Sequence, residues 1–175
     1  MKPPVKTAPA PAALLACMVL LACTVLLGGC AKMPGAYDYV TEDRHPAAAN
    51  DAGRGTVCFF RPETSRLGLS APYYVEEDGR QIGMLDYGTW FVHKARPGMH
   101  LYTISTESTA RTVLPAKAGE TRYVKCGSHI GVLVGRPSME PSTPEEFKAA
   151  SPKLKHIRPS TSTERKSMEA RGGKS

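Results

Sequence analysis

Histidine, cysteine and carboxylate side chains are the groups in this chain that could bind a metal ion or attack a substrate. Its 175 residues include five histidines and five cysteines. His93 and His100 lie close together in the chain, but no second pair with ligand spacing accompanies them. Zinc sites take three or four ligands. The pattern therefore predicts no metal site, and we expect no cofactor.

Nucleophilic or acid–base catalysis is not favoured either. Ser70 does not complete the Gly-x-Ser-x-Gly elbow. Cys126 precedes His129 by three positions, and residues three apart in an extended segment point to opposite faces. The run 76–78 (Glu-Glu-Asp) is better interpreted as a solvated hairpin turn than as an acid–base pair. We therefore predict no catalytic residue and a protein that is not an enzyme.

Cys30 is the cysteine whose surroundings are most informative. Lys2 and Lys6 precede an apolar run, Ala12–Leu27, that would span about 24 Å as a helix, short of a bilayer core of about 30 Å. Gly28 and Gly29 then supply small residues before the cysteine. This order is typical of a signal peptide, so we expect cleavage between Gly29 and Cys30.

The segment that ends at Cys30 resembles the lipobox of bacterial lipoproteins (Leu-Gly-Gly-Cys at 27–30). The resemblance implies that Cys30 becomes the lipidated N-terminus and anchors the protein to a membrane. Ala31 follows it where a retention signal would have aspartate, which implies the outer membrane, facing the periplasm. The inner membrane and the cell surface remain alternative locations. An uncleaved membrane helix remains the alternative to a signal peptide. A protein in this compartment would not meet nucleic acid, so we expect no nucleic-acid partner.

Cys58 and Cys126 remain once the signal is removed and Cys30 is lipidated. An even pair in an oxidising compartment favours a disulfide. Two buried free thiols are the alternative.

Charge is distributed unevenly. Residues 30–150 hold 14 Lys and Arg and 14 Asp and Glu, whereas residues 151–175 hold seven basic and two acidic residues. The polar segment 151–175 is predicted to be a disordered basic tail. It could contact anionic lipid or peptidoglycan, or serve only for solubility.

Between these ends the sequence predicts an all-β domain, 54–140, after a flexible tether, 30–53. Short runs rich in β-branched and aromatic residues alternate with turns such as Asp78-Gly79 and Pro97-Gly98. The expected strands are 56–61, 72–77, 81–85, 89–94, 100–106, 111–114, 122–126 and 130–134. They predict a small antiparallel β-sandwich of seven or eight strands. One short helix is expected within 141–150, with Thr143 as N-cap.

Aromatic residues could form a recognition surface on this domain. Neighbouring strand residues point to opposite faces, so some of them must face outward. The alternative is that most alternate into the core. The residues concerned are Tyr73, Tyr74, Tyr87, Trp90 and Phe91.

An ordered set of motifs resembles the family known as domain of unknown function 2846, whose members are mostly short bacterial lipoproteins. The motifs are 58–62 (Cys-Phe-Phe-Arg-Pro), 75–83, 97–100 (Pro-Gly-Met-His), 119–124 and 131–138. Their spacing is also similar to the PEGA-type sandwich of envelope proteins. The resemblance implies a transthyretin- or PEGA-like sandwich and no established activity. Cys58 and the basic tail depart from the family pattern.

Two classes of function are therefore open. The first is a lipid-anchored binding or structural module of the cell envelope, whose partner would be an unidentified envelope protein. The second is a small-ligand binder, for glycan or peptide, or an enzyme at the membrane surface. A deep pocket lined by several polar residues would favour the second class.

Overall fold

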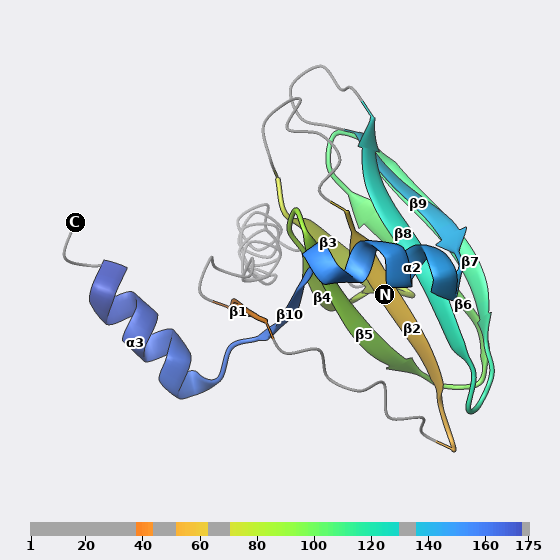
Figure 1. The fold of residues 1–175 in the computed structure, drawn as a ribbon, viewed down its shortest axis with the longest axis horizontal. Coiled ribbons are helices and arrows are strands. Elements are labelled where there is room, and N and C mark those ends of the chain that lie inside the picture. Colours follow the sequence, from red (N-terminus) through yellow and green to blue (C-terminus); the bar gives the residue numbers. More distant parts are fainter. Residues whose placement is uncertain (1–37, 44–51, 63–70, 130–135, 173–175) are drawn as a thin grey trace, which may run out of the picture. The chain divides into compact units, whose positions relative to one another are not determined.

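The computed structural model describes residues 38–43, 52–62, 71–129 and 136–172. It consists mostly of β-strands in two sheets, with two short α-helices (Figure 1). The strands are β1 (Tyr39–Glu42), β2 (Gly55–Arg61), β3 (Tyr73–Glu77), β4 (Arg80–Leu85), β5 (Thr89–Ala95), β6 (Gly98–Ser105), β7 (Thr109–Ala116), β8 (Thr121–His129), β9 (Arg136–Ser142) and β10 (Lys155–Pro159). The α-helices are α2 (Pro144–Ala150) and α3 (Ser162–Gly172). A short 3-10 helix, η1 (Ser151–Lys153), follows α2.

One sheet has six strands in the order β1-β10-β5-β2-β8-β9, and the other has four in the order β4-β3-β6-β7. The four-stranded sheet is antiparallel throughout. In the six-stranded sheet β10 runs parallel to β5, and β2 runs parallel to β8. The prediction of a wholly antiparallel domain is therefore wrong in this sheet, because hairpin turns in the sequence fix the direction only of strands that follow each other directly.

The main core lies between the two sheets, where β7 lies beside β9 and β4 lies beside β5 and β10. Alternating residues of β2 and β3 supply it, among them Val57, Phe59 and Val75, all of which are buried. Phe59 stacks on Phe91 and meets the edge of Tyr102, so aromatic rings join the sheets. The period of two in the sequence therefore places one face of each strand inward.

A second, smaller core lies on the other face of the six-stranded sheet, which α2 crosses in Figure 1. Phe147 of α2 packs against the rings of Phe60 and Trp90. The side chain of Thr143 accepts a hydrogen bond from the backbone N–H of Glu146, as expected for the N-cap. This helix lies within the range 141–150 that the sequence predicts for it.

The C-terminal segment departs from expectation. The sequence predicts that residues 151–175 are disordered, but this segment includes η1, β10 and α3. Leu154 and Ile157 are buried, and β10 lies between β1 and β5 in the sheet. The prediction failed because composition measures only local apolar content, whereas β10 is stabilised by partners more than 60 residues away in the chain.

The predicted tether, 30–53, is also partly wrong. Its residues 39–42 form β1, which pairs antiparallel with β10. The ion pair between Asp38 and Arg165 of α3 adds a second link between the same two segments. The predicted strand 130–134 lies outside the described residues, and so do the predicted signal peptide and Cys30.

Candidate functional site

Glu77 is the acidic residue at which the two sheets meet. It follows Tyr73 and Val75 on the inward-facing side of β3, and its pairing partner on β6 is Tyr102. The phenol of Tyr102 donates a hydrogen bond to Oε1 of Glu77 over 3.0 Å. Nε2 of His93, on the inward face of β5, lies 3.0 Å from Oε2. Both carboxylate oxygens of Glu77 are therefore engaged.

His100 completes this group from β6. Its Nε2 lies 2.7 Å from the carbonyl oxygen of Arg96, which can only accept, so Nε2 carries a hydrogen. Its Nδ1 lies 3.2 Å from Oε1 of Glu77 and 3.4 Å from Oδ2 of Asp78. Nδ1 is buried and makes no hydrogen bond with a described residue. Burial, followed by the hydrogen bond to Glu77, raises the pKa of Tyr102, which keeps that phenol a donor.

This arrangement corrects the interpretation of residues 76–78 as a solvated turn. The side chain of Glu77 is only 19% exposed, and it lies between two histidines. The alternation of β3 contained the signal, since Glu77 stands two positions after Val75. Asp78, in contrast, does lie in the hairpin turn, where its Oδ1 accepts from the backbone N–H of Leu101.

A polar hollow of about 490 Å³ opens beside the Glu77 group, and we call it the polar basin. Its volume falls in the range of about 300–1,000 Å³ typical of ligand sites. Four of the residues that line it are cationic and two are acidic. They are Arg54, Glu77, Asp78, Arg80, His93, Lys94, Arg96 and His100.

The polar basin is lined by charged side chains and histidines that can donate and accept hydrogen bonds. None of its lining residues is a serine, threonine or cysteine that could serve as a nucleophile. Within the described ranges, no group of three or more His, Cys, Asp or Glu could hold a metal ion. His93 and His100, the histidines considered for a metal in the sequence, instead face opposite oxygens of Glu77.

The two thiols that could have formed a disulfide are free. Cys126 belongs to the core between the sheets, whereas Cys58 belongs to the core beneath α2. They therefore lie on opposite faces of the six-stranded sheet, and the disulfide hypothesis is wrong for this fold. Burial raises the pKa of Cys126 to about 12, and burial also raises that of Cys58. His129 is exposed on β8 and forms no pair with Cys126.

The aromatic surface considered in the sequence is largely internal. Tyr73, Trp90 and Phe91 are buried. The guanidinium of Arg61 lies between the rings of Tyr73 and Tyr87, 3.6 Å and 3.8 Å from their centroids. That stacking leaves little ring face for a ligand. Ser70 lies outside the described residues.

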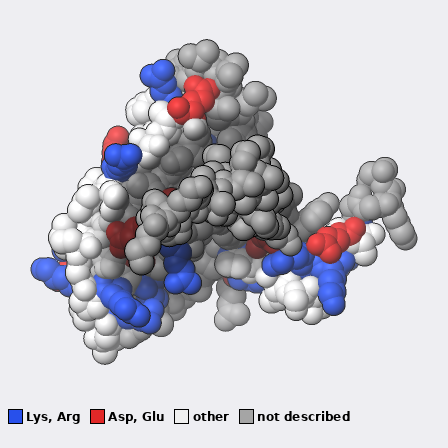
Figure 2. Space-filling view, turned by 180° about the vertical axis from the view of Figure 1, so that it is seen from behind, with Lys and Arg blue, Asp and Glu red and all other residues white. Residues whose placement is uncertain are grey.

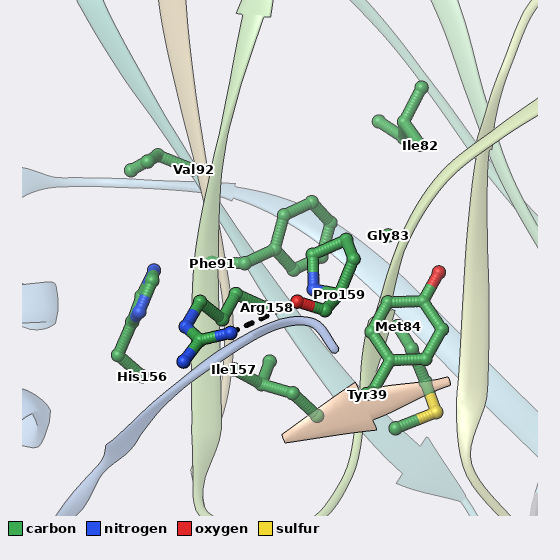
Figure 3. A pocket seen from close by; sticks show the side chains of 10 residues that line it. All are labelled: Tyr39, Ile82, Gly83, Met84, Phe91, Val92, His156, Ile157, Arg158 and Pro159. Atoms are coloured by element: carbon green, nitrogen blue, oxygen red, sulfur yellow. Dashed lines mark hydrogen bonds between the residues drawn. The ribbon is translucent and has the colours of Figure 1, made fainter. Parts of the chain in front are cut away.

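A second pocket, of about 250 Å³, is mainly apolar and lies where β4 approaches β10 (Figure 3). Figure 3 shows His156, Val92 and Arg158 on one side and Tyr39, Met84 and Ile82 on the other. Arg158 pairs with Glu42 and Glu164, so the polar groups at this rim are already engaged. The pocket is also smaller than most ligand sites. We therefore do not assign it a ligand.

Basic side chains of the C-terminal segment are partly neutralised. Lys155 pairs with Asp43, and Arg165 pairs with Asp38. On the described part of the face in Figure 2, Lys and Arg occur at several separate places, interspersed with acidic side chains. Two of the basic residues of the predicted tail, Lys155 and Arg165, are therefore paired with carboxylates of the segment that contains β1.

In comparisons with known proteins, no family model, no curated protein and no solved structure matches this chain. Among the helices that the structure describes, none combines the length and the apolar character needed to cross a membrane.

Proposed function

We propose that this protein is a lipid-anchored lipoprotein of the bacterial cell envelope whose β-domain is a binding module and not an enzyme. The observation that carries the proposal is the Leu-Gly-Gly-Cys motif at 27–30, behind an apolar run too short to span a bilayer. Acyl chains on Cys30 would anchor the domain, because two or more chains give stable membrane attachment. Ala31 favours the outer membrane, with the domain facing the periplasm.

We propose further that the two sheets form a β-sandwich of the transthyretin or PEGA kind, as in the domain of unknown function 2846 family. The inward-facing core between a six-stranded and a four-stranded sheet supports this assignment. The two parallel pairings depart from a simple antiparallel sandwich. An unidentified envelope protein remains a candidate partner of such a module.

The polar basin supports binding of a small polar ligand as the activity of this module. It is concave and lined mainly by charged side chains, which can hold a ligand through charge-assisted hydrogen bonds. Anionic lipid or peptidoglycan could additionally contact exposed basic residues of the C-terminal segment, such as Lys153 and Lys166.

Mass spectrometry of the protein purified from a bacterial membrane fraction tests the anchor. We expect loss of residues 1–29 and added acyl mass on Cys30. Cys30→Ser should leave an unprocessed precursor that still contains Met1. Cys17→Ser, within the same signal, is the matched control and should be processed normally. An intact Met1 in the wild-type protein would overturn the proposal.

A further inference from the structure

The charges of the polar basin do not balance. Arg54, Arg80 and Arg96 face a space whose described lining contributes two carboxylates, those of Glu77 and Asp78. One of these, Glu77, is already engaged by His93, His100 and Tyr102, as described above. The basin therefore has an excess of positive charge that an anionic ligand would neutralise.

Two of these cations are available for a ligand. The side chains of Arg80 and Arg96 make no hydrogen bond or ion pair with any described residue, and both residues are exposed. Arg54 donates only one long hydrogen bond, 3.5 Å, to the carbonyl oxygen of Lys94. A guanidinium presents its donors as a planar fork that matches a carboxylate or phosphate. The unpaired arginines therefore favour a ligand with such an acidic group.

The basin also offers an acceptor. The side chain of Asp78 is 59% exposed, and its contacts with His100 and with the N–H of Leu101 leave lone pairs on its two oxygens. A carboxylate next to arginines is suited to accept hydrogen bonds from hydroxyl groups. An anion without a hydroxyl group would leave this acceptor unused, whereas a sugar acid has both an acidic group and several hydroxyls.

We infer that the polar basin binds an acidic saccharide, with Arg80 and Arg96 holding its carboxylate and Asp78 accepting from a hydroxyl. A hollow of about 490 Å³ is large enough for a sugar unit. The inference deepens the proposed function, because the envelope is where such saccharides would meet the domain. It places the ligand in the basin and not on the C-terminal segment.

Calorimetric titration of the purified mature protein, kept in detergent, with a trisaccharide of galacturonic acid tests the inference. We expect binding that weakens with added salt, because exposed charges are screened. A galactose trisaccharide, which has the hydroxyls but no acid, should not bind measurably. Arg80→Gln combined with Arg96→Gln should weaken binding at least about 10-fold, since hydrogen bonds to charged groups are the strong ones.

The matched control is Arg111→Gln combined with Arg136→Gln, which removes two exposed arginines outside the basin and should leave binding unchanged. Unchanged thermal unfolding of both double variants would show that they fold. Equal binding by the basin variant, equal binding of the neutral trisaccharide, or no binding of the acidic one would overturn the inference. So would displacement of the acidic trisaccharide by equimolar inorganic phosphate, or arginine-dependent binding to phosphatidylglycerol vesicles, either of which would indicate a phosphate site. None of these outcomes depends on whether Cys30 is lipidated, so the two proposals fail separately.

Discussion

His93 and Glu77 connect the two sheets through their side chains, with Nε2 of His93 on β5 lying 3.0 Å from Oε2 of Glu77 on β3. Each residue continues an apolar, inward-facing series of its own strand. The polar group therefore occupies a place where the alternation would otherwise put a core residue. It also forms one wall of the polar basin, so the same contact serves packing and the candidate site.

Replacement of Glu77 by alanine should destabilise the fold. The hydroxyl of the fully buried Tyr102 would lose its acceptor, and the two histidines would lose their carboxylate. We expect a loss of about 1–3 kcal/mol in the free energy of unfolding, as for other buried groups left unpaired. Denaturant titration measures it. Glu140→Ala, at an exposed position on β9, should change stability by less than about 0.5 kcal/mol, and equal losses in both variants would contradict the role of Glu77.

The turn between β3 and β4 should tolerate only certain residues at position 79. Gly79 has φ of +80°, and no atom lies within 4 Å of the position of an added Cβ. Gly79→Val should therefore lose about 1–2 kcal/mol from backbone strain alone. Gly79→Asn should lose less, because asparagine enters the left-handed region more readily. Thermal unfolding distinguishes the two variants, and unchanged stability of the valine variant would refute the strained turn.

Packing of α2 can be followed through Trp90, the single tryptophan of the chain. The ring of Phe147 lies 5.2 Å from that of Trp90 and 5.4 Å from that of Phe60, measured between centroids. Phe147→Ala should expose the indole, shift its fluorescence to longer wavelength and reduce stability by about 2 kcal/mol. The neighbouring exposed Lys148→Ala should leave the spectrum as it is. An unshifted spectrum in the phenylalanine variant would mean that α2 does not cover Trp90.

The C-terminal segment should be sensitive to acid. Hydrogen bonds from Arg158, and then from Thr161, lower the pKa of Glu164 from 4.5 to about 2. The folded state stabilises the ionised form of Glu164. The contribution of this residue to stability is therefore complete above about pH 4.5 and is lost as the pH falls through about 2. Protection of the α3 amides against hydrogen exchange should therefore decrease over that interval.

Glu164→Gln should reduce the same protection at neutral pH, because it removes the ion pair with Arg158. The control is Glu169→Gln, at an exposed position on the same helix, which should leave the protection of the α3 amides unchanged. Equal protection in both variants would show that the ion pair does not hold α3.

Sequence reasoning located β2 to β8 and α2 because each has a local signal. Thr56–Arg61 is rich in β-branched and aromatic residues, Asp78-Gly79 marks a hairpin, and Thr143 caps a helix. Each of these signals depends on residues that are close together in the sequence. Neighbouring residues are therefore enough to predict these elements. The sequence does not predict that the side chains of Glu77, His93 and His100 contact each other. The alternation of each strand does place all three on inward faces.

What the sequence by itself determined is therefore the β-rich character of the domain, most of its strands and the motif around Cys30. The tertiary structure alone decided that β10 enters a sheet beside β5, that Cys58 and Cys126 lie on opposite faces, and that four cations line one basin. The physical reason is that these features depend on pairing between strands distant in sequence. Local composition contains no information about which strand will become the neighbour of another, and a change of neighbour or register moves every side chain that follows.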